Sequence, residues 1–406
     1  MKYLIVVPDG AGDNKMAELN GKTPLQVANL EYIDSLAAKG EVGMVATVPD
    51  GIAPGSDAAN LAVMGYDPRK YLTGRSPLEA VSMGVNLEDD DTAFRVNLVT
   101  LEGDGPFKDR VMVDHSSGDI STEDGVELLK TIANEFASPI RSFYGGTGYR
   151  HCMVAKNFEG KPECTPPHDI LGKKIGDYLP LGNGGEELLK IMEGSVELLK
   201  DHPINLLRES QGLRPATAAW IWGQGTRPNL PSFNERYGIG GSVISAVDLI
   251  KGIATYAKLN VINVEGATGN IHTNYEGKAQ AAIDAFKSGY DFVYIHVEAP
   301  DECSHQGDLQ GKIKSLENID QRIVKPVVEA LKNSGEDFSV LIVPDHKTPI
   351  ELRTHTSQPV PYVIYRNFDE HEEDKSRQFN EYSGLDGGFF EDGESMADYF
   401  FGKAQQ

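Results

Sequence analysis

Acidic and histidine residues follow several of the predicted strands. Asp9 follows the first strand, Asp301 comes shortly after a second, and Asp345 comes directly after a third. Because ligands in α/β proteins bind at the carboxyl ends of parallel strands, we expect these carboxylates to meet at one edge of a sheet. His346 follows Asp345 directly, so the pair could contact two neighbouring metal ions.

Two further histidines extend this set. Asp301 and His305 are four residues apart and would share one face of a helical turn, where carboxylate and imidazole suit Zn²⁺ or Mn²⁺. His355 lies within an Arg-Thr-His-Thr run. Taken singly, each residue is as readily explained as a turn former, a helix cap or a solvated side chain. Together they suffice for two metal sites.

A serine supplies a candidate nucleophile. Ser56 lies in Pro54–Asn60, just before a short helical pattern at Leu61–Gly65. The dipole and free amides at a helix N-terminus favour a phosphate or an alkoxide, although Ser56 could also be a plain helix cap. Coordination to a divalent metal activates a hydroxyl. Two metals and a serine fit an in-line phosphoryl transfer.

Composition and charge limit the possible partners. The 406 residues are 40% hydrophobic and 24% charged, as in ordinary globular proteins, and the length favours two domains. The net charge of -23 disfavours nucleic acid and anionic membranes as partners, so an anionic substrate would need metal ions or a few arginines. The three cysteines form no disulfide framework, and no apolar run spans a bilayer. We expect a soluble, cytoplasmic protein.

Short apolar runs alternate with helical patterns, which predicts an α/β sandwich around a largely parallel sheet. Strands are expected at Tyr3–Val7, Val42–Thr47, Phe94–Thr100, Ala219–Trp222, Leu259–Val264, Phe292–Val297, Ser339–Val343 and Tyr362–Tyr365. Helices are expected at Pro24–Lys39, Thr122–Phe136, Gly185–Lys200, Ser245–Ala257, Gly277–Ser288 and Leu309–Asn333. Dense turn signals predict a small inserted α+β domain at 111–179, within a core made of 1–110 and 180–406.

Several motifs are spread along the whole chain. They include Pro8-Asp9-Gly10, Gly55-Ser56-Asp57, Arg95-Val96-Asn97, Ile120-Ser121-Thr122, Asp301 with His305, Asp345-His346 and His355-Thr356. Together they resemble the cofactor-independent phosphoglycerate mutases of the archaeal type, in the alkaline-phosphatase superfamily. The resemblance implies an alkaline-phosphatase-like three-layer sandwich with a mostly parallel central sheet. The inserted domain would be a cap over the substrate.

The resemblance also implies roles for the site residues. One metal would be held by Asp301, His305 and His355, and the other by Asp9, Asp345, His346 and the oxygen of Ser56. Mn²⁺ or Zn²⁺ suits these ligands best, and Mg²⁺ or Co²⁺ is possible. Ser56 would take the phosphoryl group from 3-phosphoglycerate and return it to the other hydroxyl, which gives 2-phosphoglycerate.

One segment departs from the family. Where those mutases carry an arginine-rich turn before Ile-Ser-Thr, this chain has Asp114–Asp119, and an aspartate there would repel a carboxylate or a phosphate. The candidate substrate-binding residues that remain are Arg75, Arg150, His151, His168 and Arg227.

This departure leaves room for other functions. The run Lys347–Ile350 and the Arg-Thr-His-Thr run resemble a bacterial branch proposed to phosphorylate homoserine with ATP. Such a kinase would use the same serine and metals, and Asp114 and Asp119 could bind the ammonium of an amino acid. A phosphatase, another phosphomutase and a metal-stabilised binding protein without turnover are further alternatives.

Overall fold

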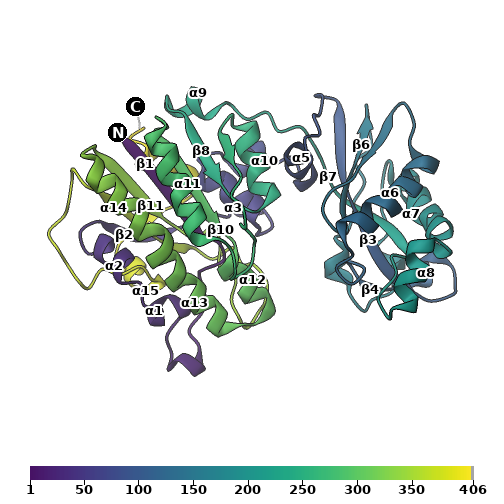
Figure 1. Cartoon of the computed structure of the whole chain (residues 1–406), viewed down its shortest axis with the longest axis horizontal. Helices are drawn as coiled ribbons and strands as arrows, with labels where there is room; N and C mark the ends of the chain where they lie inside the picture. The colour runs from purple at the N-terminus through teal and green to yellow at the C-terminus, as the bar shows by residue number, and fades with distance from the viewer. Residues whose placement is uncertain (404–406) are drawn as a thin grey trace. The chain divides into compact units, whose positions relative to one another are not determined.

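The computed structural model describes residues 1–403, which divide into two compact units (Figure 1). The first unit consists of Met1–Leu72 together with the chain from Asn229 onward. The second unit is the insertion between them, Thr73–Pro228.

The first unit is built on a mostly parallel sheet. Within the described residues it has eight strands, in the order β13-β2-β12-β11-β1-β10-β8-β9. Their bounds are β1 Lys2–Pro8, β2 Glu41–Val45, β8 Gly241–Ile244, β9 Asn260–Ile262, β10 Phe292–Val297, β11 Phe338–Ile342, β12 Val360–Arg366 and β13 Gly388–Phe390. Only β12 runs antiparallel to its neighbours β11 and β2. The parallel strands β1, β10 and β11 therefore form the centre of the sheet.

Helices cover both faces of this sheet (Figure 1). Their bounds are η1 Ala17–Leu19, α1 Pro24–Val27, α2 Glu31–Ala37, α3 Ser56–Val63, α4 Pro68–Tyr71, α9 Phe233–Tyr237, α10 Asp248–Tyr256, α11 Tyr275–Lys287, α12 Ala299–Gln306, α13 Leu309–Ile319, η5 Asp320–Val324, α14 Lys325–Ser334, α15 Glu381–Leu385 and α16 Gly393–Phe400. Helices α2, α11, α13 and α14 share one core with Leu4 and Val6 of β1. Helices α10 and α16 both pack on α3. The predicted three-layer α/β sandwich is confirmed.

Two predicted helices are interrupted in the structure. The stretch Pro24–Lys39 forms α1 and α2, because the backbone at Ala28 is extended, with ψ 140°. The stretch Leu309–Asn333 passes through the π-helical turn η5 just before Pro326, which has no N–H to offer. The strands β8 and β13 were not predicted, since runs of four and three residues give little periodic signal.

The second unit is an α+β structure on an antiparallel sheet. Its elements are α5 Arg75–Ser82, β3 Asp91–Glu102, η2 Phe107–Asp109, β4 Val111–Asp114, α6 Thr122–Phe136, β5 Arg141–Tyr144, β6 Arg150–Lys156, η3 Pro167–Ile170, η4 Ile175–Tyr178, α7 Gly185–Lys200, α8 Pro203–Ser210 and β7 Ala218–Thr226. Strand β3 pairs with β4, β6 and β7. The predicted insertion 111–179 was therefore too narrow, because it leaves out β3, which pairs with three other strands, and β7, which pairs with β3.

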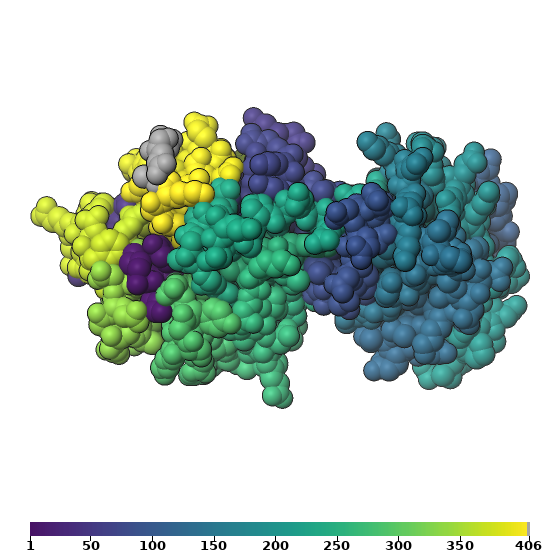
Figure 2. Space-filling view, turned by 90° about the horizontal axis from the view of Figure 1, so that it is seen from above, coloured from purple at the N-terminus to yellow at the C-terminus, as the bar shows by residue number. Residues whose placement is uncertain are grey.

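The two ends of the chain meet in the first unit. The ring of Tyr3 at the start of β1 lies 5.6 Å from that of Phe400 in α16. Figure 2 shows the first residues, in purple, beside the last helix, in yellow, on one face of this unit. Among residues 1–403, no helix has the length and apolar character needed to cross a membrane.

Candidate active site

The residues predicted as metal ligands converge at the carboxyl edge of the large sheet. Strand β1 lies between β10 and β11 and runs parallel to both, so Asp9, Asp301 and Asp345 leave the sheet side by side. Gly10 permits this close approach. Its φ is 63°, and a Cβ atom there would lie 2.5 Å from Asp301 Oδ1.

One group of ligand atoms surrounds Ser56. Asp9, Asp345 and His346 each offer an atom within 4.8 Å of the others. His346 Nε2 lies 3.6 Å from Asp9 Oδ1, 3.4 Å from Asp345 Oδ2 and 3.2 Å from Ser56 Oγ. Ligands about 2.1 Å from a tetrahedral ion lie roughly 3.4 Å apart. These four side chains are therefore spaced as ligands of one ion would be.

A second group lies beside the first. Asp301, His346 and His355 offer atoms within 4.8 Å of one another. His305 Nε2 lies 3.1 Å from Asp301 Oδ2 and 3.0 Å from His355 Nε2. The structure thus brings together the predicted set Asp301, His305 and His355, and it also places His346 within reach of both groups.

Hydrogen bonds orient the histidines of both groups. Thr348 Oγ1 donates to Asp301 Oδ1 at 2.5 Å, so its oxygen is left to accept from His346 Nδ1 at 3.2 Å. His305 Nδ1 donates to the carbonyl of Arg353 at 2.9 Å. In both rings Nε2 is the nitrogen turned toward the carboxylates, the arrangement found in metal-binding histidines.

The buried charges fit divalent cations. Asp9 is 1% exposed, and its Oδ1 has no hydrogen-bond partner among residues 1–403. Burial, followed by the charges of Asp345 and Asp301, raises the pKa of Asp9 well above its usual value. Burial alone would lower the pKa of His305, but Asp301 raises it to about 9, so a cation would displace a proton there. Three crowded carboxylates with histidines suit divalent metal ions.

In the second unit, arginines and aromatic rings gather around Glu79. Its Oε1 accepts from Arg75 Nε at 2.8 Å and from Arg95 Nη1 at 2.6 Å. The guanidinium of Arg95 lies 5.2 Å from the Trp222 ring centroid, and the ring of His168 lies 5.3 Å from the same ring. We call these residues, with Arg150 and the rings described next, the arginine cluster.

Arg150 joins the arginine cluster through aromatic contacts. Its guanidinium lies 5.1 Å from the Tyr149 ring centroid, and the ring of His115 contacts those of both Tyr149 and His168. Burial lowers the pKa of His168 to about 4 and also lowers that of His115. Three guanidinium groups and one carboxylate leave the cluster positively charged, which suits an anionic ligand.

Two predicted substrate-binding residues lie apart from the arginine cluster. His151 is 2% exposed, and its Nδ1 accepts from the backbone N–H of Gly146 at 3.2 Å. Burial, followed by Arg95, lowers the pKa of His151 to about 4. Arg227 pairs with exposed Asp89 at 3.5 Å. Since His151 and His168 are neutral at pH 7, neither is favoured as a general acid.

Within the acidic segment that departs from the family, the charge of Asp114 is compensated by local contacts. Asp114 Oδ2 accepts from Arg214 Nη1 at 2.5 Å and from the N–H of Gly118 at 3.0 Å. Its Oδ1 accepts from the N–H and the hydroxyl of Ser116. Burial would raise the pKa of Asp114, but these bonds lower it. Its charge therefore holds the loop and is not left for an ammonium group.

Several residues that take part in the metal-ligand groups or in the arginine cluster were not predicted, among them Glu79, Arg95, His115 and Thr348. Arg95 stands in the Arg95-Val96-Asn97 motif, to which no role was given. Arg95 and Asn97 are polar residues two apart within the otherwise apolar stretch Ala93–Val99 of β3, and this spacing indicates one polar face. Glu79 and His115 carry no comparable pattern in the sequence.

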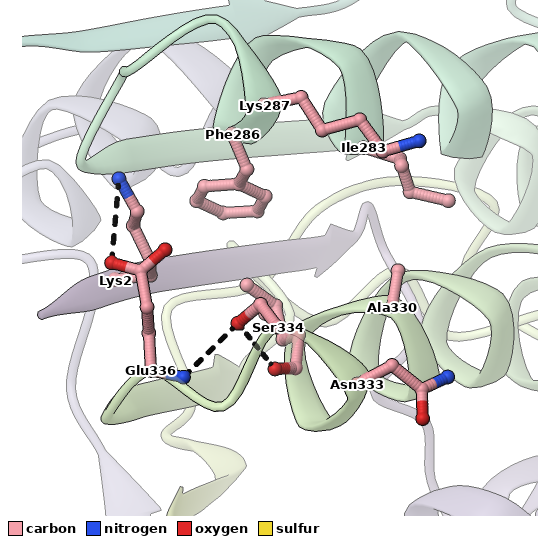
Figure 3. A pocket seen from close by; sticks show the side chains of 9 residues that line it. Lys2, Ile283, Phe286, Lys287, Ala330, Asn333, Ser334 and Glu336 are labelled. Atoms are coloured by element: carbon pink, nitrogen blue, oxygen red, sulfur yellow. Dashed lines mark hydrogen bonds and ion pairs between the residues drawn. The ribbon is translucent and has the colours of Figure 1, made fainter.

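A separate cavity of about 450 Å³ lies at the opposite end of the large sheet (Figure 3). Phe286 and Ile283 of α11 face Ala330 of α14 across it. Lys2, at the start of β1, lines its edge and bonds to Asp291 at 3.1 Å. None of the predicted site residues lines this cavity.

The fold and the two neighbouring ligand groups, one of them beside a serine at a helix N-terminus, define a class, the α/β proteins with residues for a pair of metal ions. The chain belongs to the family of 2,3-bisphosphoglycerate-independent phosphoglycerate mutases. The model of that family matches residues 37–205. A protein of that name from Methanosarcina barkeri is 47% identical over 388 residues, which cover 95% of this chain and 96% of the relative.

Two solved structures resemble the whole chain. A Pyrococcus horikoshii protein aligns with a TM-score of 0.80 and 28% identity, over 100% of this chain and 98% of the other. A cofactor-independent phosphoglycerate mutase from Thermoplasma acidophilum aligns with a TM-score of 0.64 and 26% identity, over the full length of both. The predicted resemblance to this family is thereby confirmed.

Proposed function

We propose that this protein interconverts 3-phosphoglycerate and 2-phosphoglycerate through a phosphoserine at Ser56. The observation that carries the proposal is the position of Ser56 Oγ, 3.2 Å from His346 Nε2 and beside the ligand group Asp9, Asp345 and His346. Membership of the mutase family supports the choice of substrate.

The proposed reaction transfers the phosphoryl group twice. Ser56 Oγ loses its proton and bonds to phosphorus while the bond from phosphorus to the C3 oxygen breaks, and that oxygen takes up a proton. In the second half the C2 hydroxyl loses a proton and attacks the phosphoserine, which regenerates Ser56. Two divalent ions, held by Asp9, Asp345 and His346 and by Asp301, His305 and His355, would supply charge neutralisation and a more acidic serine hydroxyl.

Ser56 is well placed for an anionic reaction. It is the first residue of α3, where the N–H groups of Ser56 and Asp57 have no backbone partner within the helix, whereas the N–H of Ala58 donates to Asp57 Oδ1 at 2.9 Å. A phosphoryl group on Ser56 would therefore meet free amides and the positive end of the helix dipole. For the substrate itself, we propose the arginine cluster with Arg75, Arg150 and His168 as the anion-binding group of the second unit.

The alternative of an ATP-dependent homoserine kinase receives less support. The acidic pocket predicted for it consists of Asp114 and Asp119, and of these two carboxylates Asp114 is paired with Arg214. Thr348 belongs to the run Lys347–Ile350, which resembles the kinase branch, and it bonds to Asp301 and His346. Any member of the fold with these ligands could use a threonine in this way, so Thr348 does not favour the kinase.

Phosphorus NMR distinguishes these functions in one tube that contains protein, Mn²⁺, 3-phosphoglycerate, ATP and homoserine. We expect a growing 2-phosphoglycerate signal at constant ATP, and no product with Ser56→Ala. A phosphohomoserine signal with loss of ATP would establish the kinase instead. Release of inorganic phosphate alone would indicate a phosphatase.

A further inference from the structure

Beneath the proposed metal ligands lies a chain of buried polar side chains that the reaction does not use. Asn60 Nδ2 donates to Asp345 Oδ2 at 2.8 Å, and the hydroxyl of Tyr294 donates to Asn60 Oδ1 at 2.5 Å. All three side chains are completely buried. They come from three elements, since Asn60 lies on α3, Tyr294 on β10, and Asp345 follows β11.

The bonds of Asp345 leave one direction for a cation. Its Oδ1 accepts from the N–H groups of Gly10, at 3.1 Å, and His346, at 2.9 Å, which uses both lone pairs of that oxygen. Its Oδ2 accepts from Asn60 at 2.8 Å and lies 3.4 Å from His346 Nε2. Asn60 therefore decides where the remaining lone pair of Oδ2 points.

The amide of Asn60 can adopt only one orientation. Its second N–H donates to the carbonyl oxygen of Ser56 at 2.9 Å. A flipped amide would turn its oxygen toward two acceptors, Asp345 Oδ2 and the Ser56 carbonyl. Burial, with the charges of Asp345 and Asp9, raises the pKa of Tyr294, so its hydroxyl keeps the proton that Asn60 Oδ1 accepts.

We propose that Asn60, held by Tyr294, is a positioning residue that fixes Asp345 as a metal ligand and ties the backbone of Ser56 to it. The inference rests on the proposed metal site at Asp9, Asp345 and His346. Partners that orient a metal ligand typically contribute 10- to 100-fold to metal affinity. Loss of the Tyr294 hydroxyl leaves Asn60 Oδ1 buried without a donor and removes one of the three hydrogen bonds that hold the amide in place.

The test is isothermal titration of the metal-free protein with Mn²⁺. We use His355→Ala as the background, because it removes a ligand of the other group and leaves the site with Asp345. Adding Tyr294→Phe should weaken Mn²⁺ binding roughly tenfold, and adding Asn60→Ala should weaken it by up to about 100-fold. The matched control is Tyr66→Phe, because Tyr66 is equally buried and its hydroxyl donates to the carbonyl of Pro231 at 3.0 Å.

Thermal melts of the metal-free proteins separate positioning from general stability. Tyr294→Phe and Tyr66→Phe should lower the melting temperature to a similar extent, and only Tyr294→Phe should weaken Mn²⁺ binding. Unchanged affinity in Tyr294→Phe and in Asn60→Ala, or an equal loss in Tyr66→Phe, would overturn the inference. If the wild-type protein bound neither Mn²⁺ nor Zn²⁺, the proposed function itself would fall.

Discussion

The two units present their polar side chains in opposite ways. In the first unit Asp9, Asp345 and His346 are at most 1% exposed and come from the ends of parallel strands. In the second unit the side chain of Arg75 is 40% exposed and Arg150 is exposed as well, on and around an antiparallel sheet. Ligands that must hold a fixed geometry are locked by burial, whereas groups that bind a diffusing anion must stay accessible.

The comparison predicts that turnover falls most when a site residue of the first unit is removed. Ser56→Ala should reduce mutase turnover by at least about 10⁴-fold, because no other group can take its place as the nucleophile. A coupled assay for 2-phosphoglycerate measures this. The control is Ser35→Ala, an exposed serine on α2 whose hydroxyl bonds only locally. Residual activity above a few per cent in Ser56→Ala would remove Ser56 from the reaction.

Removal of divalent ions should have the next largest effect. We expect dialysis against a chelator to lower turnover by roughly 10³-fold or more, since such ions contribute several kcal/mol to the transition state. Adding Mn²⁺ or Zn²⁺ should restore activity and raise the melting temperature of the first unit, because the ions bind only its folded form. If metal analysis found no ions left in the protein and it were still fully active, this prediction would be wrong.

Changes in the arginine cluster should mainly weaken substrate binding. Arg150→Met should raise KM about 10- to 100-fold with a smaller change in kcat, because a charge-assisted hydrogen bond contributes about 1.5–3 kcal/mol. The control Lys130→Met removes an exposed charge of the same unit that pairs only with Glu127 on α6. If both variants had the same KM, the cluster would not be the anion site.

The smallest predicted effect concerns His151. The pKa of His151 is about 4 in the folded protein and about 6.5 when unfolded, so the unfolded state binds its proton first. Stability should therefore fall as the pH drops from 6.5 toward 4, by about 2 kcal/mol at pH 5. That corresponds to roughly 4–8 °C in the melting temperature of the second unit.

Melting curves at pH 7 and pH 5 check this prediction. His151→Gln should lose less stability between the two pH values than the wild type does. His371→Gln, which changes an exposed histidine, should behave as the wild type. Equal losses in all three proteins would show that His151 is not the group responsible.

The sequence predicted the first unit better than the second. Buried parallel strands such as Phe292–Val297 are continuous apolar runs, and the residues just after them had to lie at one edge of the sheet. The arginine cluster depends on pairing between β3, β6 and β7, which are far apart in the chain. No local sequence pattern indicates such pairings. The prediction of substrate-binding residues therefore missed Glu79 and His115 and included Arg227.

By itself, the sequence determined the layered α/β class, the set of possible metal ligands and the candidate nucleophile, because these follow from local periodicity and residue chemistry. Only the tertiary structure decided that His346 reaches both ligand groups, that Asp114 is paired with Arg214, and that Tyr294 holds Asn60. Asp114 and Arg214 are 100 positions apart in the chain, and Asn60 and Tyr294 are 234 positions apart. Such contacts are fixed by the packing of the folded chain and leave no trace in the spacing of residues.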